Sequence, residues 1–287
     1  MTESEDLKEM IKDKYGAIAR QSKEENETSC CGTGCGCSTV EFSVMAENYS
    51  SLSGYIADAD LGLGCGLPTE FARIRSGDTV VDLGSGAGND AFVARAIVGE
   101  SGTVIGIDMT PEMINKARAN TLKMNFANVE FRLGDIENIP VQNNSADVVV
   151  SNCVMNLVPN KTKAFSETFR ILKPGGHFSV SDIVLRGELP DAARKSAELY
   201  AGCVSGAQQM DDYLQVIRDT GFTNITIQKE RSITIPDELL LHYMSSEELK
   251  DFHNRGIGIL SITVYADKPL TKGANGVCCG PDCCSNS

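Results

Sequence analysis

The sequence predicts an α/β fold: a doubly wound, mostly parallel sheet with helices on both faces, followed by a smaller C-terminal α+β cap. Short apolar runs typical of buried strands alternate along the chain with segments whose apolar residues recur every three or four positions. In addition, the glycine-rich stretch V-D-L-G-S-G-A-G at residues 81–88 leads from such a strand into such a helix. A loop of this kind lets the backbone approach a ligand at a helix N-terminus, so we expect a binding site there.

Composition and charge narrow the class of protein. The 287 residues are enough to bury a core, and 26 Lys and Arg against 39 Asp and Glu give a formal charge of −13. With this negative charge, the chain is not expected to bind nucleic acid or an anionic membrane through a basic surface. The first residues are polar and acidic, and no stretch approaches the roughly 20 apolar residues that span a bilayer. We expect a cytoplasmic monomer with neither nucleic acid nor membrane as a partner.

Residues 1–60 are predicted to form a helix and a cysteine-rich arm. Apolar residues at helical spacing predict one amphipathic helix over residues 6–19, which can dock on a larger body. Residues 24–39 are polar, rich in glycine and cysteine and without periodicity, so we predict a loop. The stretch L-G-L-G-C-G-L-P at residues 61–68 then leads into a short helix.

A strand–helix series over residues 61–187 forms the predicted ligand-binding domain. Its proline at position 111 suits the first turn of a helix. The predicted strands are 78–83, 103–108, 129–133, 146–151 and 176–184, and the predicted helices are 89–98, 111–124 and 161–172.

The pattern is looser after residue 186, where we predict the cap over residues 188–268 and a flexible tail over residues 269–287. The tail is small, polar and rich in cysteine and glycine. The elements predicted in the cap are helices over 191–201 and 211–220 and strands over 223–230 and 258–266.

Three strand-end residues fit a nucleotide-type cofactor. Asp108 ends the second strand about 20 residues after the glycine loop, where a carboxylate can accept hydrogen bonds from both ribose hydroxyls. Met109 can lie against an adenine face, and Asp135, after the third strand, can accept from an adenine amino group. Each has an ordinary alternative, since strand-end aspartates often cap the next helix and a methionine can belong to the core.

The stretches V-D-L-G-S-G-A-G, I-G-I-D and G-D-I resemble the motifs of class I S-adenosylmethionine-dependent methyltransferases, whose sheet is Rossmann-like. The resemblance implies S-adenosylmethionine as the cofactor. It also implies that the loop glycines surround the methionine and ribose portions, and that the two strand-end acids hold the ribose and the adenine. A nicotinamide enzyme is the main rival, but the spacing G-x-G-x-G differs from its fingerprint G-x-G-x-x-G. The implied cofactor residues are Asp82, Gly84, Gly86, Gly88, Asp108, Met109 and Asp135.

Eleven cysteines in a chain of this length, without a secretory leader, are expected to be reduced and functional. Three of them stand alone: Cys65, Cys153 and Cys203. Cys153 follows the fourth strand, where open α/β sheets bind ligands, and its neighbour Asn152 can contact cofactor or substrate. Cys65 is flanked by glycines, which we expect to leave its sulfur accessible. The ordinary alternative is that a single free cysteine is a small buried apolar residue.

The wide spacing of these three cysteines excludes a zinc site of the C-x-x-C type, but three loops converging above the sheet could join three sulfurs in a trigonal site. Their surroundings, L-G-L-G-C-G-L-P, S-N-C-V-M-N-L-V-P and A-G-C-V-S-G-A, resemble the motifs of arsenite S-adenosylmethionine methyltransferases. The resemblance implies that Cys153 and Cys203 hold trivalent arsenic. It also implies that Cys65 and one N-terminal cysteine assist binding or form a disulfide as the product leaves. We take Cys31 as that cysteine and keep Cys30, Cys35 and Cys37 as alternatives.

The predicted function is therefore methyl transfer from S-adenosylmethionine to thiolate-bound arsenic, giving mono- and dimethylated products for detoxification. The partners this implies are arsenite or its thiol adducts, and small thiols or a thioredoxin-type reductant. Two alternatives remain: a small-molecule C- or O-methyltransferase with incidental cysteines, and a non-enzymatic soft-metal binding protein. The terminal clusters, residues 30–37 and 278–284, could capture arsenic or be solvated thiols.

Overall fold

The computed structural model describes residues 3–21, 47–188, 191, 206–234, 237–241, 244–255 and 258–270. Cys203 and both terminal cysteine clusters lie outside these ranges, as do all but the first two residues of the predicted tail and almost all of the predicted helix over 191–201.

Within the described ranges, seven strands form one sheet in the order β3-β2-β1-β4-β5-β7-β6. The first five strands in this order pair in parallel, and β7 pairs antiparallel with both β5 and β6. The α/β fold is thus confirmed. The strands are β1 (Thr79–Leu83), β2 (Thr103–Asp108), β3 (Val129–Leu133), β4 (Ala146–Asn152), β5 (Leu172–Arg186), β6 (Thr223–Ile233) and β7 (Gly258–Asp267).

The helices cover both faces of this sheet. On one face, α3, α4 and α5 pack around Phe92, which meets Phe131 of β3 edge to face. On the other face, α6 and α8 pack around Phe165, which contacts Phe178 of β5 and Tyr213 of α8. The helices on the faces are α3 (Pro68–Phe71), α4 (Asn89–Val98), α5 (Pro111–Met124), α6 (Lys161–Ile171) and α8 (Met210–Asp219).

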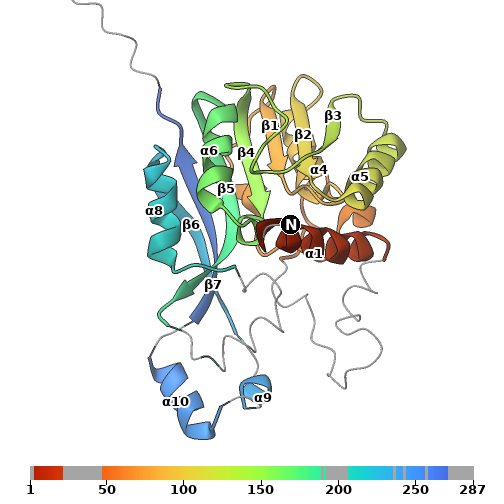
Figure 1. Ribbon diagram of the computed structural model, residues 1–287. Coiled ribbons are helices and arrows are strands. Elements are labelled where there is room, and N and C mark those ends of the chain that lie inside the picture. The colour runs from red at the N-terminus through yellow and green to blue at the C-terminus, as the bar shows by residue number, and fades with distance from the viewer. Residues whose placement is uncertain are drawn as a thin grey trace, which may run out of the picture.

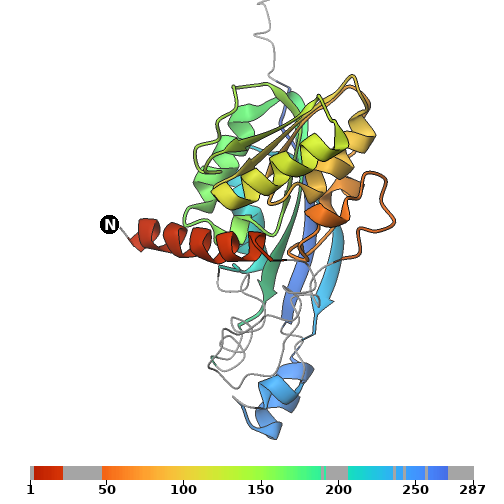
Figure 2. The same cartoon turned by 90° about the vertical axis from the view of Figure 1, so that its right-hand side faces the viewer.

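The chain order reverses between β1 and β4, because the strands run outward to β3 on one side and then return to start β4 on the other. A reversal of this kind opens a crevice at the carboxyl ends of the strands. The first helix, α1 (Glu3–Ala19), runs across this end of the sheet, roughly perpendicular to the strands (Figures 1 and 2). Two short 3-10 helices, η2 (Ala57–Ala59) and η3 (Met155–Leu157), border the same end.

The strands expected in a C-terminal cap exist, and the structure places them in the main sheet. β7 pairs with β5 along its whole length, from His177 opposite Asp267 to Arg186 opposite Gly258. Because β7 is almost completely buried, the sheet needs a strand on its other side, and β6 fills that position. Two further helices, α9 (Asp237–Leu240) and α10 (Ser246–Asn254), lie beyond the far ends of these strands (Figure 1). The predicted domain boundaries stay predictions.

Candidate active site

A cavity opens at the carboxyl ends of β1, β2, β3 and β4, beneath α1. It holds about 1120 Å³ of empty space, part of it open to solvent. Most of the sequence-predicted cofactor residues line it together: Asp82, Gly84, Gly86, Asp108, Met109, Asp135 and Asn152. Cys153 lines it as well, so the structure brings the expected cofactor residues and one expected arsenic ligand into a single cavity.

Asp82 offers an open acceptor at the floor of this cavity. Its side chain is buried, and its Oδ2 makes no hydrogen bond with any described residue. Burial, together with the negative charges of Asp90 and Asp108, raises the pKa of Asp82 well above its ordinary value. A cation or a strong hydrogen-bond donor bound here would offset that cost.

The charged residues that line the cavity are mostly acidic. Among the described residues that line it, Lys8 is the single Lys or Arg. The carboxylates that line it are Glu47, Asp60, Asp82, Asp90, Asp108 and Asp135. A wall of this kind favours a cationic ligand and disfavours a polyphosphate.

The glycine loop is held against Asp108 by its own backbone. Gly86 N donates to Asp108 Oδ2 at 2.9 Å, and Thr110 N donates to Oδ1 at 2.8 Å. Burial raises the pKa of Asp108, although these two hydrogen bonds lower it. Each carboxylate oxygen can accept a second hydrogen bond, so the pair of ribose hydroxyls expected from the sequence still finds acceptors.

Gly88 differs from the other loop glycines, because it does not line the cavity. It begins α4 with a φ of 102°, and a Cβ at this position would lie 2.6 Å from the ring of Phe92. Close packing against Phe92 thus requires a glycine here, and its place among the cofactor residues stays a prediction. Gly84 has a φ of 70° and faces Val154, whose side chain a Cβ would meet at 2.2 Å.

Asp135 is bound by a lysine of the first helix. Lys8 Nζ lies 2.6 Å from Asp135 Oδ2 and 2.7 Å from Glu137 Oε2, and Glu137 N donates to Asp135 Oδ1 at 2.8 Å. Burial alone would raise the pKa of Asp135, but the hydrogen bonds from Lys8 and the Glu137 amide outweigh burial, and the pKa lies below its ordinary value. The carboxylate is therefore ionised at neutral pH. Glu137 Oε1 also accepts from Asn160 N at 2.8 Å, which ties α1 to the start of α6.

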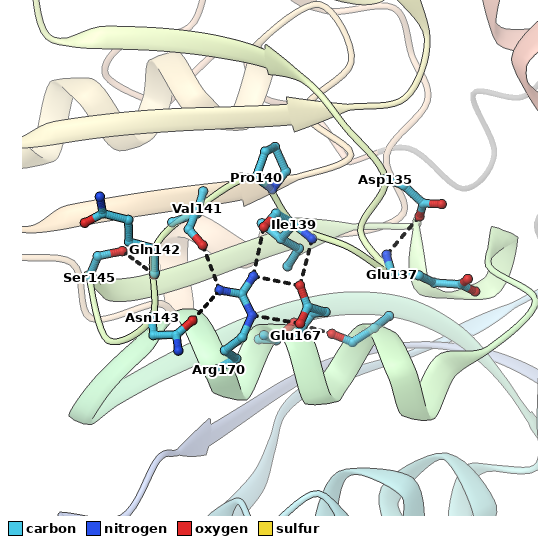
Figure 3. A network of polar contacts seen from close by, with 12 residues as sticks. Asp135, Glu137, Ile139, Pro140, Val141, Gln142, Asn143, Ser145, Glu167 and Arg170 are labelled. Carbon is cyan, nitrogen blue, oxygen red and sulfur yellow. Dashed lines mark hydrogen bonds and ion pairs between the residues drawn. The ribbon is translucent and has the colours of Figure 1, made fainter.

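The connection that carries Asp135 is clamped from α6 (Figure 3). Arg170 donates to the carbonyl oxygens of Ile139 and Val141, each at 2.8 Å. Glu167 pairs with Arg170 at 2.7 Å and accepts from Ile139 N at 2.8 Å. Because Glu167 and Arg170 lie on one turn of α6, they hold the backbone at Ile139 and Val141 against that helix.

Asn152 joins the cofactor side of the cavity to Cys65. Its Nδ2 donates to Tyr49 Oη at 2.6 Å and to Gly66 O at 2.8 Å, while its Oδ1 accepts from Cys65 N at 3.0 Å. Tyr49 Oη in turn lies 2.9 Å from both carboxylate oxygens of Asp90. Burial raises the pKa of Asp90 to about 6, although hydrogen bonds from Asn152 and Tyr49 lower it.

Cys65 is completely buried, so the expectation that its neighbours leave the sulfur accessible is wrong. The flanking glycines serve close packing. A Cβ at Gly64 would lie 2.7 Å from Asn152 Nδ2, and one at Gly66 would lie 2.5 Å from Ser181 Oγ. Ser261 Oγ of β7 also donates to Cys65 O at 2.6 Å.

Cys153 has a left-handed backbone conformation, with a φ of 61°, immediately after β4. Its N donates to Ser181 O of β5 at 2.8 Å, and its side chain is 3% exposed. Among the described residues, neither Cys65 nor Cys153 forms a disulfide. Through Asn152, the backbone of Cys65 is linked to the residue that precedes Cys153, but Cys153 lines the cavity and the buried Cys65 does not.

Sequence reasoning missed four residues of this site: Lys8, Tyr49, Asp90 and Glu137. Asp90 carried a signal, since it is an acid just after the glycine loop, but an acid in the first turn of a helix is also ordinary. Lys8, Tyr49 and Glu137 act through partners far away in the sequence, and no local pattern marks them. Of the cysteines expected to hold arsenic or to pair with Cys65, Cys203 and Cys31 lie outside the described residues.

In the described parts of the chain, no three His, Cys, Asp or Glu side chains gather as a metal site. None of the helices described there is long and apolar enough to cross a bilayer.

Comparison with known proteins assigns the family. A methyltransferase-domain family model matches residues 74–221. An arsenite methyltransferase from Halobacterium salinarum is 39% identical over 280 residues, which cover 92% of this chain and 67% of that protein. The mouse arsenite methyltransferase is 31% identical and covers 84% of this chain and 65% of its own length.

Solved structures agree with the sequence relatives. An arsenic(III) S-adenosylmethionine methyltransferase from Chlamydomonas reinhardtii superposes with a TM-score of 0.60 at 33% identity, covering 72% of this chain and 68% of that one. The YcgJ protein of Bacillus subtilis, at 19% identity and a TM-score of 0.58, covers 71% of this chain and 97% of its own and shares the fold.

Proposed function

This chain belongs to the arsenite methyltransferase family, and on that premise we propose that it transfers methyl groups from S-adenosylmethionine to trivalent arsenic held by cysteine thiolates. The observation that carries the proposal is the shared cavity: the expected cofactor residues and Cys153 line the same space. Methylation of arsenic would serve detoxification and give mono- and dimethylated products.

The cavity fits the cofactor chemically. S-adenosylmethionine carries a sulfonium and an ammonium, and the wall is rich in carboxylates. Asp82, with its unpartnered Oδ2, suits the ammonium, Asp108 the ribose hydroxyls, and Asp135 the adenine amino group. The same charge disfavours the pyrophosphate of a nicotinamide cofactor. When bound, the cofactor supplies an electrophilic methyl group that the arsenic lone pair attacks, while the electron pair of the broken C–S bond stays on sulfur.

The thiols supply the arsenic site. In the proposal, Cys153 and Cys203 each exchange an arsenic-bound hydroxyl for an As–S bond, and one water leaves for each bond. Cys65 assists, next to Asn152. Holding arsenic in a near-attack position is the main contribution of the protein, and such positioning can account for ~7 to 11 kcal/mol of a barrier.

Methyl transfer takes arsenic formally from As(III) to As(V), so a return to As(III) needs two electrons. We assign these to two thiols that close a disulfide, Cys65 with an N-terminal cysteine, Cys31 being our candidate. A small thiol or a thioredoxin-type protein would then reduce the disulfide. The cytoplasmic location and the monomeric state stay predictions.

One assay tests the proposal directly. Purified protein is incubated with arsenite, a small thiol and methyl-labelled S-adenosylmethionine, and the products are separated and identified by mass. We expect labelled methyl- and dimethylarsenicals. Labelled S-adenosylmethionine that binds but gives no methylarsenical would contradict the proposal and favour a C- or O-methyltransferase.

A further inference from the structure

The helix α1 forms one wall of the cofactor cavity. Lys8, Ile11 and Tyr15 of this helix line the cavity together. They stand three and four positions apart in the sequence, so they lie on one face of the helix. Two other apolar residues of α1, Leu7 and Met10, are 38% and 63% exposed. The helix therefore covers the carboxyl ends of the strands with one face while part of its surface meets solvent (Figures 1 and 2).

The C-terminal end of α1 is fastened to α5. Lys116 Nζ of α5 donates to Ala19 O and to Gln21 O, each at 3.1 Å. Carbonyl groups at a helix C-terminus have no partner within the helix, so a lysine placed there satisfies them. One residue after α1 ends, Arg20 pairs with Glu112 of α5 at 2.8 Å. This end of the helix is thus tied to the body of the domain by contacts that lie outside the cavity.

The N-terminal half of α1 is tied to the connection after β3 by Lys8. Its Nζ lies 2.6 Å from Asp135 Oδ2 and 2.7 Å from Glu137 Oε2. The side chains of Lys8 and Glu137 are only 20% and 7% exposed, and partly buried ion pairs are screened much less by salt than surface pairs. Asp135 lines the cavity, whereas Glu137 does not. Lys8 therefore joins the helix to the expected adenine acceptor and to an anchor behind it.

We propose that α1 is a lid on the cofactor site, hinged at the end that Lys116 holds, and that Lys8 is the positioning residue that keeps it closed. The closed lid places Ile11 and Tyr15 against bound S-adenosylmethionine, and opening breaks both Lys8 ion pairs. Lids of this kind control how fast a ligand leaves its site. The inference goes beyond the proposed function and takes from it only the place of the cofactor in this cavity.

Lys8→Met tests the lid through the rate of cofactor release. Labelled S-adenosylmethionine is bound without arsenite, chased with excess unlabelled S-adenosylhomocysteine and followed by rapid filtration. We expect release at least about tenfold faster, because two charge-assisted contacts are lost. Lys8→Arg, which keeps a cationic donor, should recover most of the slow release. Lys12→Met is the matched control and should match the native protein, because Lys12 pairs with Glu9 of the same helix.

Glu137→Gln separates the lid from direct contact with the cofactor, because Glu137 does not line the cavity. Glutamine keeps an acceptor for Asn160 N but removes the charge that faces Lys8. Release should be at least about threefold faster, since a charge-assisted hydrogen bond becomes a neutral acceptor contact. Glu130→Gln is the matched control, because Glu130 pairs with Arg132 of its own strand. A native release rate in Lys8→Met or in Glu137→Gln would overturn the proposal.

Hydrogen exchange, followed by mass spectrometry, observes the lid itself. Saturating S-adenosylhomocysteine should slow exchange of the amides of residues 3–19 at least about fivefold in the native protein, and clearly less in Lys8→Met. Exchange that does not respond to the ligand would refute the lid even if arsenite is methylated. Conversely, a protein whose α1 is protected as expected, but which never methylates arsenite, would overturn the proposed function and leave the lid standing.

Discussion

The cofactor side and the thiol side of the cavity are built from different kinds of contact. On the cofactor side, carboxylates are held by nearby backbone: Asp108 by Thr110 N two residues later, and Asp135 by Glu137 N two residues later. On the thiol side, Cys65 is held by Asn152, 87 residues away, and by Ser261, 196 residues away. The cofactor side is thus a local motif repeated at strand ends, whereas the thiol side exists only in the folded chain.

This difference predicts that substitutions on the thiol side abolish substrate chemistry and spare cofactor binding. The largest effect is expected for Cys153→Ser. It should remove methylation of both arsenite and methylarsenite, a loss of at least about 1000-fold in kcat, because an arsenic ligand is gone. S-adenosylmethionine binding by calorimetry should persist. Turnover of either substrate at the native rate would contradict an arsenic-binding role for Cys153.

Cys65→Ser tests whether Cys65 has an assisting role in arsenic binding. Methylarsenite needs fewer sulfurs than arsenite, so this variant should retain more activity on methylarsenite. Equal loss on both substrates would contradict an assisting role.

Asn152→Ala should damage both sides at once, because Asn152 connects them. The substitution leaves the buried amide of Cys65 without its acceptor, and an unsatisfied buried group costs about 1–3 kcal/mol. We expect kcat/KM to fall roughly 10- to 100-fold for arsenite, and KM for S-adenosylmethionine to rise as well. Asn128→Ala is a matched control, since Asn128 bridges Gly99 O and Gly102 O away from the cavity. An effect on only one ligand would show that the sides are independent.

Asp135→Asn should weaken the binding of S-adenosylmethionine and leave arsenite binding unchanged. Lys8 loses an ionised partner and the adenine amino group loses a strong acceptor, so KM for S-adenosylmethionine should rise roughly tenfold. Arsenite binding by dialysis should not change. Asp58→Asn provides the control, because its pair with Lys123 is exposed and such pairs contribute only about 0–1 kcal/mol. Loss of arsenite binding in Asp135→Asn would contradict the division.

The smallest effect concerns pH. Burial raises the pKa of Asp182 from 3.8 to about 7, although the Ile183 amide and the charge of Lys161 lower it. A raised carboxyl pKa means that the folded state holds the proton more tightly, so its contribution to stability is complete below pH 4 and is lost as pH rises through 7. Asp182→Asn cannot ionise and should gain stability relative to the native protein between pH 5 and 8.

Calorimetric melting at several pH values measures this gain. One pKa unit corresponds to about 1.4 kcal/mol, and a chain of this size shifts by roughly 2–4 °C per kcal/mol, so several degrees are expected. A constant difference between the two proteins across this range would show that Asp182 does not titrate there.

Much of the fold followed from local patterns. The helices Asn89–Val98 and Pro111–Met124 and the strands Thr103–Asp108 and Val129–Leu133 have the predicted ends, because Gly88, Pro111 and strand-end acids mark them. The position of β6 and β7 in the main sheet could not be predicted from local patterns. β7 pairs with β5 and β6 pairs with β7, which joins strands separated by the region after residue 186, and neither spacing nor composition specifies such partners.

The site residues also fall into those that local patterns predicted and those that they did not. Asp108 and Asp135 could be assigned because Asp108 ends β2 and Asp135 follows β3, and both line one cavity. The burial of Cys65 could not be predicted, since the glycines beside it allow either exposure or close packing. Only the approach of Asn152 and Ser181 in the fold decides between them.

The carboxylate-rich wall of the cavity also acts as a filter. Arsenite is an uncharged acid near neutral pH, whereas arsenate and phosphate are anions, so the wall admits the first and repels the other two. When the methyl group leaves, the sulfonium becomes a neutral thioether, so the wall loses one counter-charge at that step.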